Sequence, residues 1–114
     1  MKDIQGEIQT NGRTYRFVFN LNVMEEIQAE YGTLDKWGEL TDGSNGEVDA
    51  HALIFGFTAM MNEAIEISND ENGTDEKLLT PKQVGRIVTE YGLSKATRQM
   101  NETIIQSTES GQKN

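Results

Sequence analysis

Residues 1–19 alternate polar and apolar side chains in the way that predicts a β-hairpin. Ile4 and Ile8 fall on one face of a first strand, and Asn11-Gly12 supplies the two positive-φ residues that a type I′ turn needs. The return strand over residues 13–19 alternates polar and aromatic residues. Its aromatic face consists of Tyr15, Phe17 and Phe19. The pattern predicts a hairpin with one face packed against the rest of the protein.

After the hairpin the apolar residues recur every three or four positions, which predicts amphipathic helices. We expect these helices over residues 23–31, 34–40, 50–67, 81–91 and 95–105. Each is preceded by a residue whose side chain caps a helix start, namely Asn22, Thr33, Asp49, Thr80 and Ser94. The strongest start is at Thr80, where Pro81 and Gln83 complete a capping box. A hairpin followed by four or five helices is an α+β fold.

The chain is long enough for one hydrophobic core and too short for two. We therefore expect a single α+β domain over residues 1–107. Two polar stretches rich in turn-forming residues, 41–47 and 68–76, are predicted to be loops within it. Residues 108–114 contain no apolar anchor and are predicted to form a disordered tail.

Composition narrows the classes of function. The sequence contains no cysteine, which excludes disulfides, thiolate metal sites and thiol nucleophiles. A net charge of −9 argues against a nucleic-acid backbone or an anionic membrane as the principal partner. The longest apolar run, residues 53–57, is far too short to span a bilayer. We expect a soluble, cytoplasmic protein.

The charge is unevenly distributed along the chain. Residues 17–76 contain fourteen acidic residues and one basic residue, Lys36, whereas residues 77–106 carry a net charge of +3. One interpretation is that solvated helix faces are simply acidic in one half of the chain. The other is an electrostatic dipole suited to self-association or to a partner with complementary patches.

No set of residues forms a recognisable catalytic or metal-binding motif. His51 is the single histidine and has no nearby cysteine or paired carboxylate, which makes it a poor metal ligand. The loop at residues 43–46 lacks the strand and the Lys-Ser/Thr pair of a phosphate-binding loop. The acidic pairs Glu25-Glu26 and Glu63-Glu66 are interpreted as solvated helix faces. We expect neither an enzyme nor a cofactor.

Two consecutive segments resemble a known family. Residues 6–19 read as a short strand, an Asn-Gly turn and a strand of the form Arg-x-Tyr-x-Phe. Residues 20–32 read as a small helix with Met-Glu-Glu-Ile that ends in glycine. Together they resemble the small tail assembly chaperones of long-tailed phages and prophages, including the related tail proteins of gene transfer agents.

The resemblance implies a non-enzymatic protein in the cytoplasm of a bacterial host. It would coat the long, helical tape-measure protein during tail assembly and keep it soluble until tail tube subunits replace it. A chaperone of this kind needs exposed apolar grooves, self-association and high solubility. Methionine adapts to varied apolar surfaces, so we expect a groove for partner helices bordered by Met24, Trp37, Met60 and Met61.

Other interpretations stay open at this point. Trp37 is also well placed to be a core residue, since a single tryptophan in a small domain is usually packed. The chain could be a small phage connector or tail component that assembles into a ring. It could also be an acidic inhibitor that mimics nucleic acid and binds a basic protein.

Overall fold

The N-terminal hairpin forms as the sequence predicts. Strands β1 (Gln5–Thr10) and β2 (Arg13–Val18) pair antiparallel, with Ile8 opposite Tyr15. Asn11 and Gly12 connect them with φ values of 53° and 75°, the positive pair that a type I′ turn requires. The structure, a computed structural model, describes residues 5–44 and 46–110. Ile4, expected beside Ile8, lies outside these residues.

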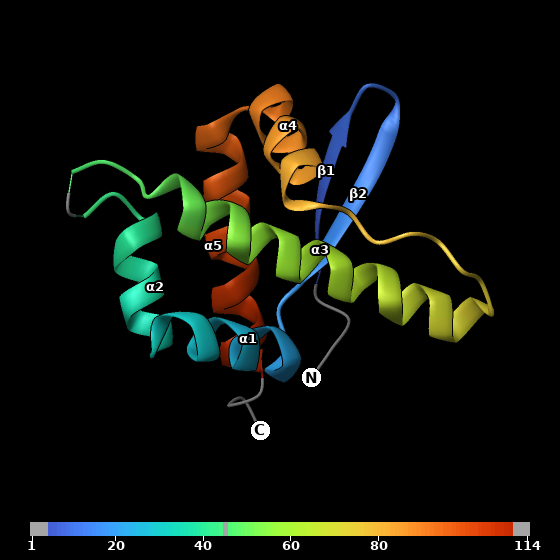
Figure 1. Ribbon diagram of the computed structural model, residues 1–114, viewed down its shortest axis with the longest axis horizontal. Coiled ribbons are helices and arrows are strands. Elements are labelled where there is room, and N and C mark those ends of the chain that lie inside the picture. The colour runs from blue at the N-terminus through green and yellow to red at the C-terminus, as the bar shows by residue number, and fades with distance from the viewer. Residues whose placement is uncertain (1–4, 45, 111–114) are drawn as a thin grey trace.

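Five helices follow the hairpin, which confirms the α+β class (Figure 1). They are α1 (Leu21–Tyr31), α2 (Leu34–Thr41), α3 (Ala50–Asn72), α4 (Pro81–Tyr91) and α5 (Leu93–Ser110). The predicted caps at Thr33 and Asp49 are confirmed, because each side chain accepts a hydrogen bond from a backbone N–H in the first turn. At Thr80 the full capping box with Gln83 is present.

The predicted start of α1 is wrong by two residues. Asn20, not Asn22, is the N-cap, and its Oδ1 accepts from the Val23 N–H at 3.1 Å. Asn22 lies within the helix, where its amide donates to Glu63 at 3.0 Å. Ser94 is likewise no cap, because α5 already begins at Leu93.

Two helices are also longer than predicted. The helix α3 continues past residue 67 to Asn72, and Gly73 then ends it in the left-handed conformation at φ 65°. The expected loop at residues 68–76 is therefore helical in its first five positions. The helix α5 runs to Ser110, so the expected domain boundary at residue 107 falls within it, and residues 111–114 lie outside the described part.

The core forms where the hairpin and α2 pack on α3. Phe17 meets Phe57 edge to face, with ring centroids 5.7 Å apart. Gly6 lies opposite Phe17 in the hairpin, and a Cβ atom there would overlap the Phe17 ring. Close by in the N-terminal part of α3, the buried Trp37 donates from Nε1 to the Ala52 carbonyl at 2.9 Å.

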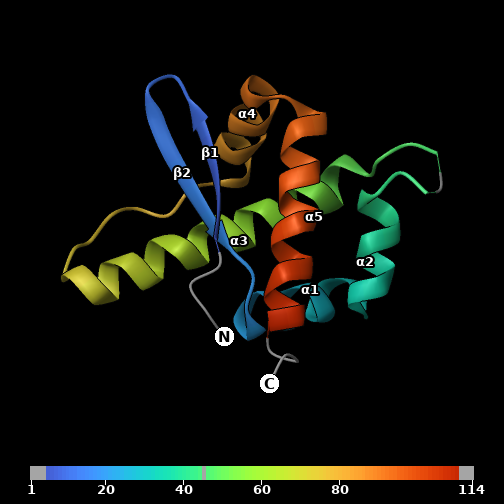
Figure 2. The same cartoon turned by 180° about the vertical axis from the view of Figure 1, so that it is seen from behind.

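The helix α3 crosses the molecule and organises the other elements. In the view of Figure 1, α1 lies below α3 and α4 above it, and the hairpin rises beside α4 with its lower end behind α3. Figure 2 shows α5 on the opposite side of α3, where it contacts β1. The segment between α3 and α4, residues 73–80, returns alongside α3 toward the centre of the molecule.

Candidate partner-binding cleft

Between Gly73, which ends α3, and the start of α4 lies the return segment, residues 74–80. It has no regular secondary structure but is attached to α3 by two asparagines. Asn62 donates to the Leu79 carbonyl at 3.0 Å and accepts from the Leu79 N–H at 2.8 Å. Asn69 makes the same pair of bonds with Glu76, both at 3.0 Å. The two asparagines are seven residues apart, two helical turns, so they share one side of α3. They hold the segment in place along the helix.

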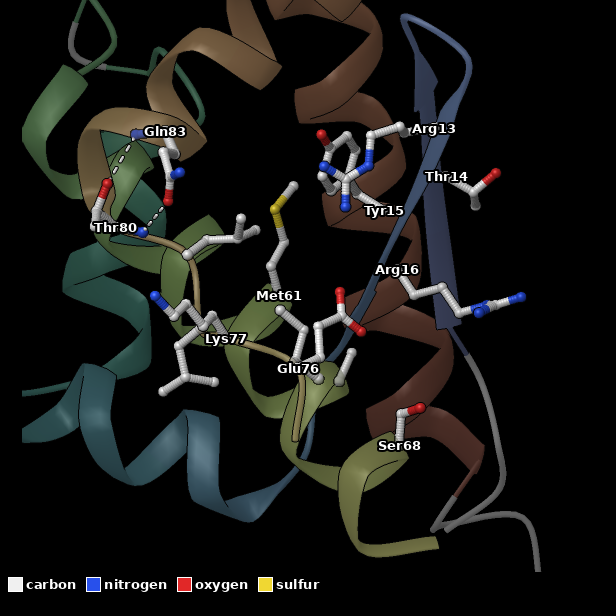
Figure 3. Close-up of a pocket in the computed structure, with 14 residues that line it drawn as sticks. Arg13, Thr14, Tyr15, Arg16, Met61, Ser68, Glu76, Lys77, Thr80 and Gln83 are labelled. Carbon is white, nitrogen blue, oxygen red and sulfur yellow. Dashed lines mark hydrogen bonds between the residues drawn. The ribbon is translucent and has the colours of Figure 1, made fainter. Parts of the chain in front are cut away.

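A cleft of about 450 Å³ lies between this segment and β2 (Figure 3). Its walls are β2 on one side and residues 76–80 on the other, and α3 lies between them. Apolar side chains from α3 and the return segment line it, namely Met61, Ala64, Ile65, Leu78 and Leu79. A cleft with an apolar lining and polar walls suits the apolar side chains of a protein partner.

The charged side chains around the cleft are mostly basic. Arg13 lies over the ring of Tyr15 at 5.2 Å, and both side chains point toward the cleft from β2. Lys77 lies on the opposite wall, next to Glu76. Arg16 lies on the solvent side of the hairpin, where its Nε is 3.5 Å from the Glu7 carboxylate. In a chain of net charge −9, the cleft is thus a place where two cations, Arg13 and Lys77, face one acid, Glu76.

The outer edge of β2 carries unpaired backbone groups. Within the described residues the sheet has two strands, so β2 pairs with β1 alone. A two-residue turn makes Thr10–Arg13 a hydrogen-bonded pair, and such pairs alternate along the hairpin. The backbone N–H and C=O groups of Thr14 and Arg16 therefore point away from β1. They add peptide donors and acceptors to one wall of the cleft.

Three of the four residues expected to border a groove are buried in this structure. Trp37 is 2 % exposed, Met60 0 % and Met61 1 %, whereas Met24 is half-buried on α1. The alternative interpretation of Trp37 as a core residue agrees with this burial. Met61 is the single member of the four that reaches the cleft, where it lies between the return segment and β2. The four residues do not share one accessible surface.

The two acidic pairs come together between α1 and α3. Glu26, Glu63 and Glu66 line one small hollow of about 280 Å³. Burial raises the pKa of Glu26, and the charges of Glu63, Glu25 and Glu66 raise it further. Glu63 also accepts hydrogen bonds from the amides of two asparagines, Asn20 and Asn22.

The remaining candidates give no recognisable chemistry. His51 is exposed in the first turn of α3, at one end of a shallow groove against α4. Across the part of the chain that the structure describes, no group of three or more histidine or acidic side chains is arranged to hold a metal ion. No helix in the described ranges is long and apolar enough to cross a membrane.

Comparison with known proteins adds no relative. No protein-family model, curated protein or solved structure matches this chain. The resemblance of residues 6–32 to tail assembly chaperones therefore stays a prediction. The sequence reasoning missed the cleft because one wall is the return segment, whose position depends on Asn62 and Asn69. The one sequence signal for it is the seven-residue spacing of these asparagines along one side of a helix.

Proposed function

We propose that this protein is a non-enzymatic tail assembly chaperone of a long-tailed phage or prophage. In the host cytoplasm it binds the helical tape-measure protein and keeps it soluble until tail tube subunits replace it. The resemblance of residues 6–32 supports the family. The observation that carries the proposal is the cleft between β2 and the return segment, where apolar side chains of α3 lie between two largely polar walls.

The cleft suits a client helix in a simple way. Apolar residues at every third or fourth position of such a helix lie on one stripe, and that stripe binds in an apolar groove. Ala64 and Ile65 provide small and medium apolar surface between the two walls. Arg13 and Lys77 on the rim pair with acidic residues beside the stripe. The acidic remainder of the surface keeps the complex soluble.

The test is co-expression with the product of the long open reading frame immediately downstream, followed by pull-down through a tag on this chain. We expect a long helical protein that is insoluble alone and that becomes soluble in a complex with many copies of this protein. If that product stays insoluble, or is soluble without this chain, the chaperone proposal fails.

A matched pair of variants tests the cleft itself. Ala64→Arg fills the cleft between β2 and the return segment, and we expect it to reduce client capture by roughly tenfold or more. Ala29→Arg makes the same change on the exposed side of α1 and should leave capture unchanged. Both variants should keep the helical circular dichroism of the parent. Equal capture by Ala64→Arg and the parent would show that the client binds elsewhere.

A further inference from the structure

The outer side of α3 carries a second surface, separate from the cleft. Where α3 meets α4, a shallow groove is lined by apolar surface from Ile54, Pro81 and Gly85. Two exposed cations, Lys82 and Arg86, lie along it, and the exposed acid on its rim is Glu90. The groove lies between α3 and α4, and α4 is the helix above α3 in the view of Figure 1.

An acidic hollow adjoins this groove on the α1 side of α3. Its apolar lining includes Phe55, Ala59 and Leu78, and Leu78 is 46 % exposed. Its rim is formed by Glu26 and Glu66, both exposed, together with Glu63. Pro81 borders both depressions, so the two are neighbours on one face.

The charges on this face are not neutralised by ion pairs with other residues that the structure describes. In the described part of the chain, the ion pair that forms is between Arg16 and Glu7 on the hairpin. No ion pair there involves the four charged residues of this face, Lys82, Arg86, Glu26 and Glu66. The face thus has an apolar centre, a basic patch on one side and an acidic patch on the other. A surface of this kind is complementary to itself.

We propose that this face of α3, with its basic patch (Lys82, Arg86) and its acidic patch (Glu26, Glu66), is a two-fold interface with a second copy of the chain. Consider a two-fold axis that lies in the plane of the face, midway between the patches and perpendicular to the line that joins them. This axis places each basic patch on the acidic patch of the other copy. The apolar centres then cover each other. The proposal does not depend on the chaperone function.

The distribution of charge on this face favours a second copy of the chain as the partner, and it favours one orientation of the two-fold axis. The alternative axis, along the line that joins the patches, would set acidic against acidic and basic against basic, which costs free energy. A partner with one sign of charge would match one patch and repel the other.

Charge reversal provides the test, because a two-fold interface allows rescue between variants. Variant A, Lys82→Glu with Arg86→Glu, makes both patches acidic. Variant B, Glu26→Lys with Glu66→Lys, makes both basic. By sedimentation velocity at low salt we expect the parent to be a dimer. We expect A and B alone to be monomers, with Kd values raised roughly 100-fold or more, and a mixture of A and B to form a heterodimer.

The control changes charge by the same amount on another surface. Lys95→Glu with Arg98→Glu reverses two exposed cations on α5 and should leave the dimer intact. The proposal is overturned if the parent is a monomer at low salt or forms assemblies larger than a dimer. It is equally overturned if A stays dimeric, or if A and B fail to associate when both are folded by circular dichroism.

Discussion

Gly56 in the middle of α3 is required by the close approach of Trp37, and replacing it by alanine tests how the helices pack. A Cβ atom at position 56 would overlap Cζ2 of the indole and lie 3.0 Å from its Cε2. The ring is 2 % exposed and its Nε1 is held to the Ala52 carbonyl at 2.9 Å, so it has no free space in which to move.

The expected magnitude is a balance of three contributions. Alanine is favoured over glycine inside a helix by about 1 kcal/mol. Forcing an extra methyl group into a packed core costs about 1–3 kcal/mol. Displacing the indole also loses its buried hydrogen bond, for about 1 kcal/mol more. We therefore expect Gly56→Ala to lower the free energy of unfolding by about 1–3 kcal/mol.

The assay is urea denaturation followed by circular dichroism and by the fluorescence of Trp37, the single tryptophan. Gly38→Ala is the matched control, because the added Cβ meets no atom within 4 Å and α2 gains helix propensity. We expect that control to raise stability by about 0.5–1 kcal/mol. If both variants change the free energy of unfolding with the same sign and size, the close approach of Trp37 is not the reason why position 56 is a glycine.

Two further predictions concern the α3 surface. Glu26→Gln should raise stability at pH 7 by about 0.3 kcal/mol at most, because the group is largely exposed. The pKa of Glu26 is raised in the folded state, so the charged carboxylate destabilises the fold at neutral pH. The stability gained by Glu26→Gln should therefore vanish below pH 4.5, where the carboxyl group is protonated in both states, and thermal melts of dilute protein measure this. A gain in stability that stays constant with pH would contradict the argument. Asn62→Ala removes both bonds to Leu79 and should cost about 1–3 kcal/mol. It should also speed trypsin cleavage after Lys77, whereas Asn22→Ala should not; unchanged cleavage would show that Asn62 does not hold the segment.

Local signals in the sequence predicted most of the fold. The Asn11-Gly12 turn and the caps at Thr33, Asp49 and Thr80 depend on neighbouring residues alone, and the structure has all of them. The end of α3 depends on more than composition. Residues 68–72 contain serine, asparagine and aspartate, which favour turns, yet they are helical. Asn69 in this turn binds residue 76 of the return segment, a contact that composition does not reveal.

The candidate site was harder to predict for a related reason. A methionine pair at helical spacing has the same pattern whether it borders a groove or fills a core. Met60 and Met61 are buried, because α3 is covered where the hairpin packs against it, with Phe17 on Phe57. The accessible apolar surface of the cleft includes Ala64 and Leu78, whose exposure depends on the path of the return segment.

The return segment also separates the two proposed surfaces, and this arrangement has a consequence for binding. The cleft lies between the segment and β2, whereas the acidic hollow lies between the segment and α1. Leu78 lines both depressions. A dimer formed through the α3 face would still leave the β2 wall of each cleft free, and two clefts on one dimer bind a long client with a higher effective concentration than one. The variants separate these contributions. Ala64→Arg should reduce capture by roughly tenfold or more while the dimer persists, and Lys82→Glu with Arg86→Glu should weaken capture although its cleft is intact.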